Sequence, residues 1–138
     1  MQRPAALRRD QEASWVWRSM DLIAKVCEMP VQLRARGNVS IVVLLDESGY
    51  FAAPASLTVD AVAAHLRSHP NIVDDWLAYS QDKRVSSGWY LIEHANGSLE
   101  LGFRSKGETL KFRDRSLACA EFIVREVSSI PTRRPTKA

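Results

Sequence analysis

The sequence lacks long hydrophobic runs. Its longest unbroken aliphatic stretch is Ile41 to Leu45, whereas a membrane-spanning helix needs about 20 consecutive apolar residues. The basic residues at its start are not followed by the apolar segment of about 7 to 15 residues that is typical of a secretory signal. We therefore expect a cytoplasmic protein that has no membrane partner.

Cysteine is scarce as well, since only Cys27 and Cys119 are present. Two thiols cannot form a disulfide framework or a zinc ribbon. Both have apolar neighbours in the sequence, and in the cytoplasm both would be reduced. The sequence therefore predicts that they are small buried side chains of the core.

The common motifs of nucleotide binding and catalysis are missing. The six glycines form neither a G-x-G-x-x-G motif nor a phosphate-binding loop, and there is no G-x-S-x-G elbow. His65 and His69 have the spacing of two metal ligands on one helix face, but the glutamate of an H-E-x-x-H motif is absent. We expect no metal and no cofactor. A hydrolase that uses Cys119 or His94 ranks third among the function classes, because no local signature supports it.

The positive charge is concentrated at the two ends of the chain. The whole sequence has 19 Lys and Arg against 16 Asp and Glu, a net charge of +3. Residues 20–130 hold 12 of the basic and 14 of the acidic residues, so the basic excess lies in residues 1–19 and 131–138. We expect 20–130 to form one globular domain, 1–19 to be a partly flexible extension leading into the first helix, and 131–138 to be a disordered basic tail.

In the first part of the chain, apolar residues recur every three or four positions from Val16 to Cys27. This spacing predicts an amphipathic helix, which Pro30 should end because proline cannot donate a backbone hydrogen bond. Residues 31–36 fit either a strand of a hairpin or a helix. The aliphatic, β-branched run at 39–45 predicts a buried strand, followed by a turn at 46–49.

The second part of the chain predicts two helices, a small sheet and a last helix. Thr58 can cap a helix that ends before Pro70, and Pro70 can open the next one. Period-two patterns then predict three antiparallel strands at 89–94, 99–104 and 109–113. A helix that ends near residue 129 should cover one side of the sheet. The predicted fold class is α+β, with an antiparallel sheet of three to five strands packed against N-terminal, central paired and C-terminal helices.

Aromatic and charged residues are densest in residues 74–90, where the helical pattern changes to the strand pattern. One interpretation is structural, with Trp76 and Trp89 as core anchors. The other is functional, because aromatic and arginine side chains dominate the hot spots of interfaces. The candidate partner-binding residues are Asp74, Asp75, Tyr79, Asp82, Lys83, Arg84, Ser86, Ser87 and Trp89.

The pattern D-D-W-L-x-Y-S-x-D-K-R-x-S-S-G-W-Y, followed by a hairpin and then A-C-A-E-F-I-x-R-E-V, resembles a group of small bacterial proteins associated with toxin immunity genes, including those of contact-dependent growth inhibition. The resemblance covers about residues 57–130. It implies a non-catalytic, cytoplasmic protein that binds one cognate toxin domain and occludes it. Exposed carboxylates would speed the encounter with a basic, phosphate-binding cleft.

The alternative function is that of a nucleic-acid-associated accessory protein with basic terminal arms. Such arms would attract phosphates in a salt-dependent way. The residues that would carry this function are Arg8, Arg9, Arg133 and Arg134. The partner that the resemblance implies is a protein, the cognate toxin domain. Because the body between the arms is slightly acidic, we expect neither nucleic acid nor a small-molecule substrate to be the main partner.

Overall fold

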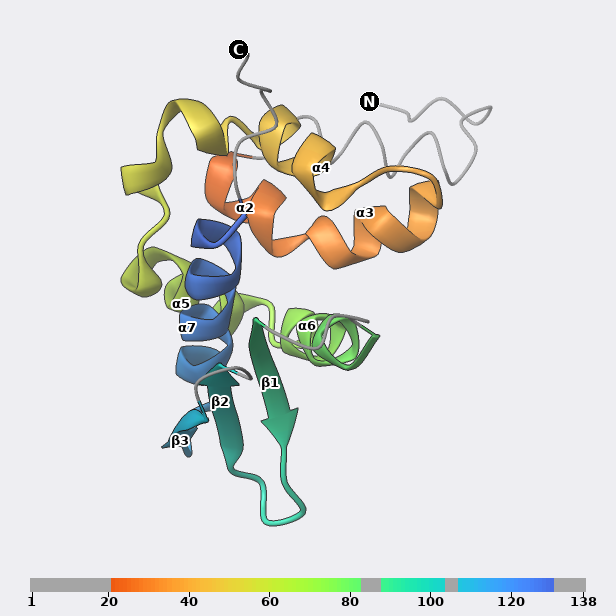
Figure 1. The fold of residues 1–138 in the computed structure, drawn as a ribbon. Helices are drawn as coiled ribbons and strands as arrows, with labels where there is room; N and C mark the ends of the chain where they lie inside the picture. The colour runs from red at the N-terminus through yellow and green to blue at the C-terminus, as the bar shows by residue number, and fades with distance from the viewer. Residues whose placement is uncertain (1–20, 83–87, 104–106, 131–138) are drawn as a thin grey trace, which may run out of the picture.

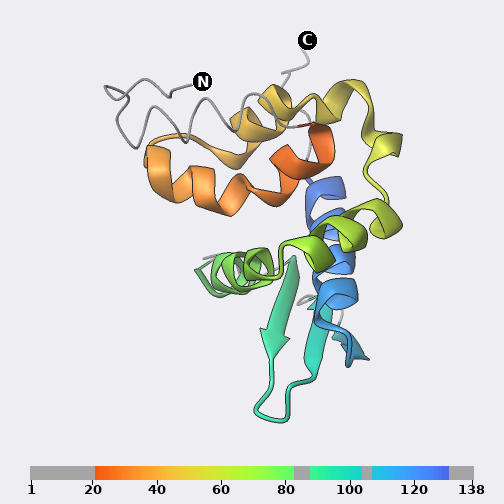
Figure 2. The ribbon, with the colours of Figure 1, turned by 180° about the vertical axis from the view of Figure 1, so that it is seen from behind.

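The computed structural model describes residues 21–82, 88–103 and 107–130. Its helices are α2 (Leu22–Cys27), α3 (Met29–Arg36), α4 (Ile41–Ser48), α5 (Val59–Ser68), α6 (Asn71–Asp82) and α7 (Arg115–Ser128), with two short 3-10 helices, η1 (Tyr50–Ala52) and η2 (Pro54–Ser56). Its strands are β1 (Trp89–Glu93), β2 (Leu99–Phe103) and β3 (Glu108–Phe112). In Figures 1 and 2, α2, α3 and α4 lie at one end of the molecule and the sheet at the other, with α5, α6 and α7 between them.

The chain bends at Glu28 between two helices, so the prediction that Pro30 ends helical structure is wrong. The first helix does stop at Cys27, but Pro30 lies in the first turn of α3. Proline is tolerated there because the first amides of a helix have no acceptor within the helix. Residues 31–36, which fitted strand or helix, are helical. The part of the predicted first helix that precedes residue 21 lies outside the described part of the chain.

The strand predicted at 39–45 is also wrong, because residues 41–48 form α4. The Ser40 side chain accepts a hydrogen bond from the Val43 amide at 3.2 Å, which caps the start of the helix. Gly49 adopts a positive φ of 89° and ends it, so the predicted turn at 46–49 is instead the last helical turn and its cap. These two caps, together with burial of one helix face, outweigh the strand propensity of the β-branched residues.

The second part of the chain follows the sequence prediction. The Thr58 hydroxyl accepts from the Ala61 amide at the start of α5, and the Asp114 carboxylate accepts from the Leu117 amide at the start of α7. The three strands form one antiparallel sheet in the order β1-β2-β3. The predicted α+β class, with a three-stranded antiparallel sheet packed against helices, is confirmed.

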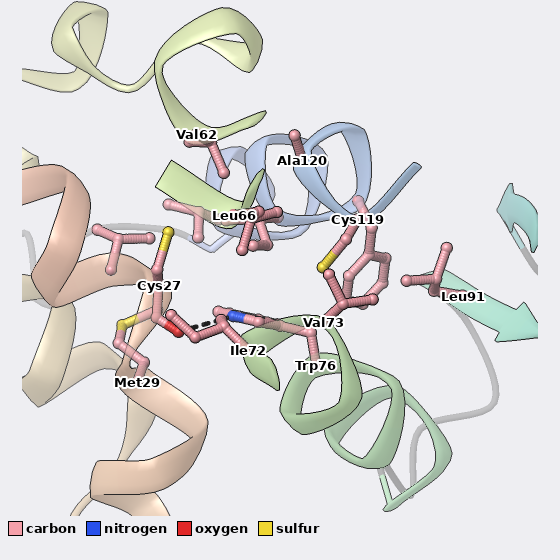
Figure 3. Packing of buried hydrophobic residues seen from close by; sticks show 14 of the residues in the cluster. Cys27, Met29, Val62, Leu66, Ile72, Val73, Trp76, Leu91, Cys119 and Ala120 are labelled. Atoms are coloured by element: carbon pink, nitrogen blue, oxygen red, sulfur yellow. Dashed lines mark hydrogen bonds between the residues drawn. The ribbon is translucent and has the colours of Figure 1, made fainter. Parts of the chain in front are cut away.

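Helix α7 packs against α5 and the sheet, and the core lies between these elements and α6 (Figure 3). Trp76 is fully buried there, and its Nε1 donates to the backbone oxygen of Cys27 at 2.9 Å, which ties α6 to the end of α2. Cys27 and Cys119 are fully buried, as the sequence predicts. Burial raises the pKa of the Cys27 thiol to about 12 and that of Cys119 further.

None of the helices in the described ranges combines the length and the apolar composition that crossing a membrane requires.

Candidate functional site

Helix α6 presents an acidic ridge to the surface. Its exposed residues recur along one side of the helix and are Asn71, Asp74, Ala78, Gln81 and Asp82. Its buried residues, on the opposite side, are Ile72, Val73, Trp76 and Ser80. This amphipathic division follows from the sequence spacing, and it places two of the predicted partner-binding carboxylates, Asp74 and Asp82, on the ridge.

Two hollows flank the α6 ridge. The larger, of about 430 Å³, lies between α6 and β1 and is lined by Leu77, Ser80, Gln81, Leu91, Ile92 and Glu93. The smaller, of about 230 Å³, lies between α3 and α6 and is lined by Pro30, Leu33, Arg34, Tyr79 and Asp82. Both mix apolar walls with polar groups at the rim, which is the composition that accepts inserted side chains of a protein partner.

The ridge is anchored to β1 by a buried hydrogen bond. The Ser80 hydroxyl, which is buried, accepts a hydrogen bond from the Leu91 amide at 2.8 Å. That amide therefore points away from β2 and towards α6, so the β1 edge beside the larger hollow faces the helix. The sequence predicts both elements but not this contact between them.

The ridge and its margins carry more negative than positive charge. The Arg115 guanidinium bridges Asp74, at 2.9 Å, and Glu93, at 3.0 Å, and these carboxylates raise its pKa. Asp75 pairs with Arg34 at 3.2 Å. Asp82 makes no ion pair or side-chain hydrogen bond with any described residue. Among the described residues, four carboxylates thus face two guanidinium groups, and Asp82 is the carboxylate that neither of these groups pairs.

The two aromatic residues predicted to bind a partner are half-buried. The Tyr79 hydroxyl donates to the buried Glu126 carboxylate at 2.7 Å, and burial together with this carboxylate raises the Tyr79 pKa. The Trp89 ring packs edge-to-face on Phe103, with ring centroids 4.8 Å apart, and lies 4.9 Å from the Arg125 guanidinium carbon. Both rings are therefore held in place, and each keeps part of its surface exposed.

Several predicted residues cannot be placed. Lys83, Arg84, Ser86 and Ser87 lie outside the described residues, as do the arginines of the nucleic-acid alternative, Arg8, Arg9, Arg133 and Arg134. Conversely, Glu93 and Arg115 belong to the site although the sequence did not point to them. The signal was weak, because an acidic residue at a strand end and an arginine at a helix start are common on any surface.

The residues considered for catalysis do not converge in the described parts of the chain. Cys119 is fully buried, and its raised pKa keeps it a thiol rather than a nucleophilic thiolate. The rings of His65 and His69 stack with centroids 4.4 Å apart, and His69 Nδ1 lies 3.0 Å from the His65 backbone oxygen. Across residues 21–82, 88–103 and 107–130, no three His, Cys, Asp or Glu side chains gather as a metal site.

The remaining polar cluster lies on the outer face of the sheet. There Glu100 accepts from the Tyr90 hydroxyl at 2.6 Å and lies 2.9 Å from His94 Nε2. These hydrogen bonds lower the Glu100 pKa. Both carboxylate oxygens are engaged, which ties β1 to β2 on the face opposite α7.

Comparison of the chain with protein-family models, with curated proteins and with solved structures finds no match. The geometry of the α6 ridge and its two hollows is therefore the basis for assigning a function.

Proposed function

We propose that the protein is a non-catalytic inhibitor of the immunity type, which binds one cognate toxin domain and blocks it by occlusion. The observation that carries the proposal is the acidic ridge of α6 between two hollows. It favours a partner that is basic at the point of contact, as the phosphate-binding cleft of a nuclease would be.

The negative charge of the α6 ridge supports this assignment, because it would attract a basic partner from a distance. Complementary charge steers two proteins together and raises the rate of association, while well-packed side chains at the centre of the interface provide most of the affinity. Asp82, whose carboxylate pairs with none of the described residues, lies at the rim of the smaller hollow. Asp74 and Glu93 share Arg115, so a cation from the partner would compete with a residue of this chain for them.

The non-catalytic part of the proposal rests on the thiols and the imidazoles. Both cysteines are buried with raised pKa values, so neither supplies a thiolate at neutral pH. His94 is engaged with Glu100 on the outer face of the sheet, and no described nucleophile is bonded to it.

Co-expression tests the proposal. The gene beside that of this chain should encode a toxic domain, and producing both proteins together should restore growth. The pair should also elute as one complex from a size-exclusion column. Toxicity that persists unchanged, with no complex on the column, would refute the proposal.

A charge reversal locates the contact. Asp82→Lys should weaken the complex by about 10- to 100-fold, equivalent to about 1.4 to 2.8 kcal/mol, because it turns attraction at the rim into repulsion. Asp46→Lys is the matched control. Asp46 is also exposed, in the last turn of α4, and α3 lies between α4 and α6 in both views of the fold (Figures 1 and 2). Equal weakening by both variants would show that net charge acts, and not the α6 ridge.

A further inference from the structure

The outer edge of β3 has backbone groups that no residue in the described part of the chain bonds. The Leu91 amide donates to Ser80 and therefore not to β2, so Leu91 and its partner Leu101 form a pair that exchanges no hydrogen bonds. Hydrogen-bonding directions alternate along an antiparallel strand. The amide and carbonyl of Leu101 therefore point to Leu110 on β3. Those of Thr109 and Lys111 point away from the sheet, where none of the described residues bonds them.

An apolar row ends at this same edge. The register places Leu91, Leu101 and Leu110 side by side on the face that α7 covers. Leu91 is 2% and Leu101 0% exposed, but Leu110 is 45% exposed. Backbone groups that no described residue bonds make a strand edge a template for pairing with another strand, and an exposed leucine beside them adds apolar surface that such pairing would bury.

We infer that β3 pairs with β3 of a second copy of this chain, forming a continuous six-stranded antiparallel sheet. A two-fold axis at Leu110 aligns Thr109 of each copy with Lys111 of the other. Since the backbone groups of these residues point outwards, each alignment forms two hydrogen bonds. The two Leu110 side chains then meet, and the row of leucines runs without interruption through both sheets.

The charge pattern along β3 is compatible with self-pairing centred on Leu110 and disfavours a register centred on Lys111. With the axis at Leu110, each Lys111 faces an uncharged Thr109 and keeps its own cross-strand neighbour, Glu100. An axis at Lys111 would place two lysines directly opposite each other, which is destabilising. Self-pairing is also isologous, so a single edge satisfies both partners and the assembly closes at two copies. The inference does not depend on the proposed function, because β3 is separate from the α6 ridge.

Cross-linking tests the pairing directly. Residues facing each other in a non-hydrogen-bonded antiparallel pair have Cα atoms about 4.5 Å apart, within the range that a disulfide spans. The variant Leu110→Cys should therefore form a covalent dimer quickly under mild oxidation. Ile92→Cys is the matched control, since Ile92 is 43% exposed but lies on β1, and it should cross-link only slowly by random collision. Equal rates for both variants would overturn the inference.

Light scattering on a size-exclusion column gives a second measurement, on the full chain, from about 1 to about 500 µM. One five-residue strand pair makes a small interface, so a monomer–dimer equilibrium in this range is expected. Lys111→Pro removes an outward amide and leaves the bonds to β2 in place. It should keep the protein monomeric and folded, as circular dichroism would verify. A wild-type protein that is monomeric throughout, or a dimer that survives Lys111→Pro, would contradict the pairing.

Discussion

Gly102 in β2 is expected to be intolerant of any side chain because a tyrosine ring lies over it. A Cβ atom built at Gly102 would lie 2.5 Å from Cζ and 2.7 Å from Cε2 of Tyr90. Ordinary carbon–carbon contact requires about 3.5 Å or more. Gly102 does not adopt a positive φ, so its backbone alone would accept alanine. The Tyr90 ring therefore decides whether Gly102→Ala is tolerated.

The loss of stability in Gly102→Ala comes from the hydrogen bond that the Tyr90 side chain would lose. To clear about 1 Å of overlap, Tyr90 has to rotate off β2 and break its 2.6 Å hydrogen bond to Glu100. A hydrogen bond to a charged group contributes about 1.5 to 3 kcal/mol, and less where solvent competes, as on this open face. Against this, alanine in a strand gains about 0.5 to 1 kcal/mol over glycine. A net loss of about 0.5 to 2 kcal/mol in the free energy of unfolding is expected.

A double-mutant cycle checks this reasoning. Gly102→Ala should lower the urea midpoint in the wild-type background, whereas in a Tyr90→Ala background the same change should be neutral or stabilising. The coupling between the two positions should therefore exceed about 1 kcal/mol, well above the roughly 0.5 kcal/mol within which independent sites add. If Gly102→Ala is equally destabilising in both backgrounds, the ring is not the cause.

Two further perturbations follow from buried or crowded titratable groups. Tyr79→Phe removes a donor from the buried Glu126 carboxylate and should cost about 1 to 3 kcal/mol in the free energy of unfolding by urea denaturation. The control is Tyr50→Phe, which should cost under about 0.5 kcal/mol because the Tyr50 side chain is buried but its hydroxyl has no described hydrogen bond. Comparable losses would show that Tyr79 acts through its ring alone. Burial and the stacked His69 lower the pKa of His65 below its ordinary 6.5. Below about pH 6.5 the unfolded chain therefore binds more protons than the folded chain does, so the free energy of unfolding should fall as the pH drops. His65→Gln should flatten this decline between about pH 7 and pH 5, and an unchanged slope would contradict the assignment.

The elements that the sequence predicts well are those whose signals are local. Asn96-Gly97 supplies the turn between β1 and β2, with Gly97 at a φ of 89°, and the alternation on either side sets the strands. The Thr58 cap is equally local. By contrast, the run at 41–45 has strand-forming residues but folds as a helix, because Ser40 and Gly49 cap it and because Leu44 and Leu45 fill the core. Its aliphatic composition fits a buried strand and a buried helix alike, and length alone did not separate them.

The candidate site also combines features that the sequence predicts with features that it does not. The spacing of Asp74 and Asp82 predicts their exposure on one side of α6, and the structure places both there. The hollows beside them could not be predicted, since one wall comes from α3 and the other from β1. The Arg115 bridge joins residues 41 positions apart in the chain, and no local pattern indicates such a partner.

The packing of α6 has a consequence for how the ridge would bind. Trp76 and Ser80, one helical turn apart on the buried side, fix the helix at two points, to the end of α2 and to the edge of β1. A helix held at two points along one side cannot roll without breaking a buried hydrogen bond, at a cost of about 1 to 3 kcal/mol. Asp74 and Asp82 therefore face solvent before any partner arrives. A ridge that is already in place loses little conformational entropy on association, so recognition through α6 would need side-chain adjustments and no backbone rearrangement of the helix.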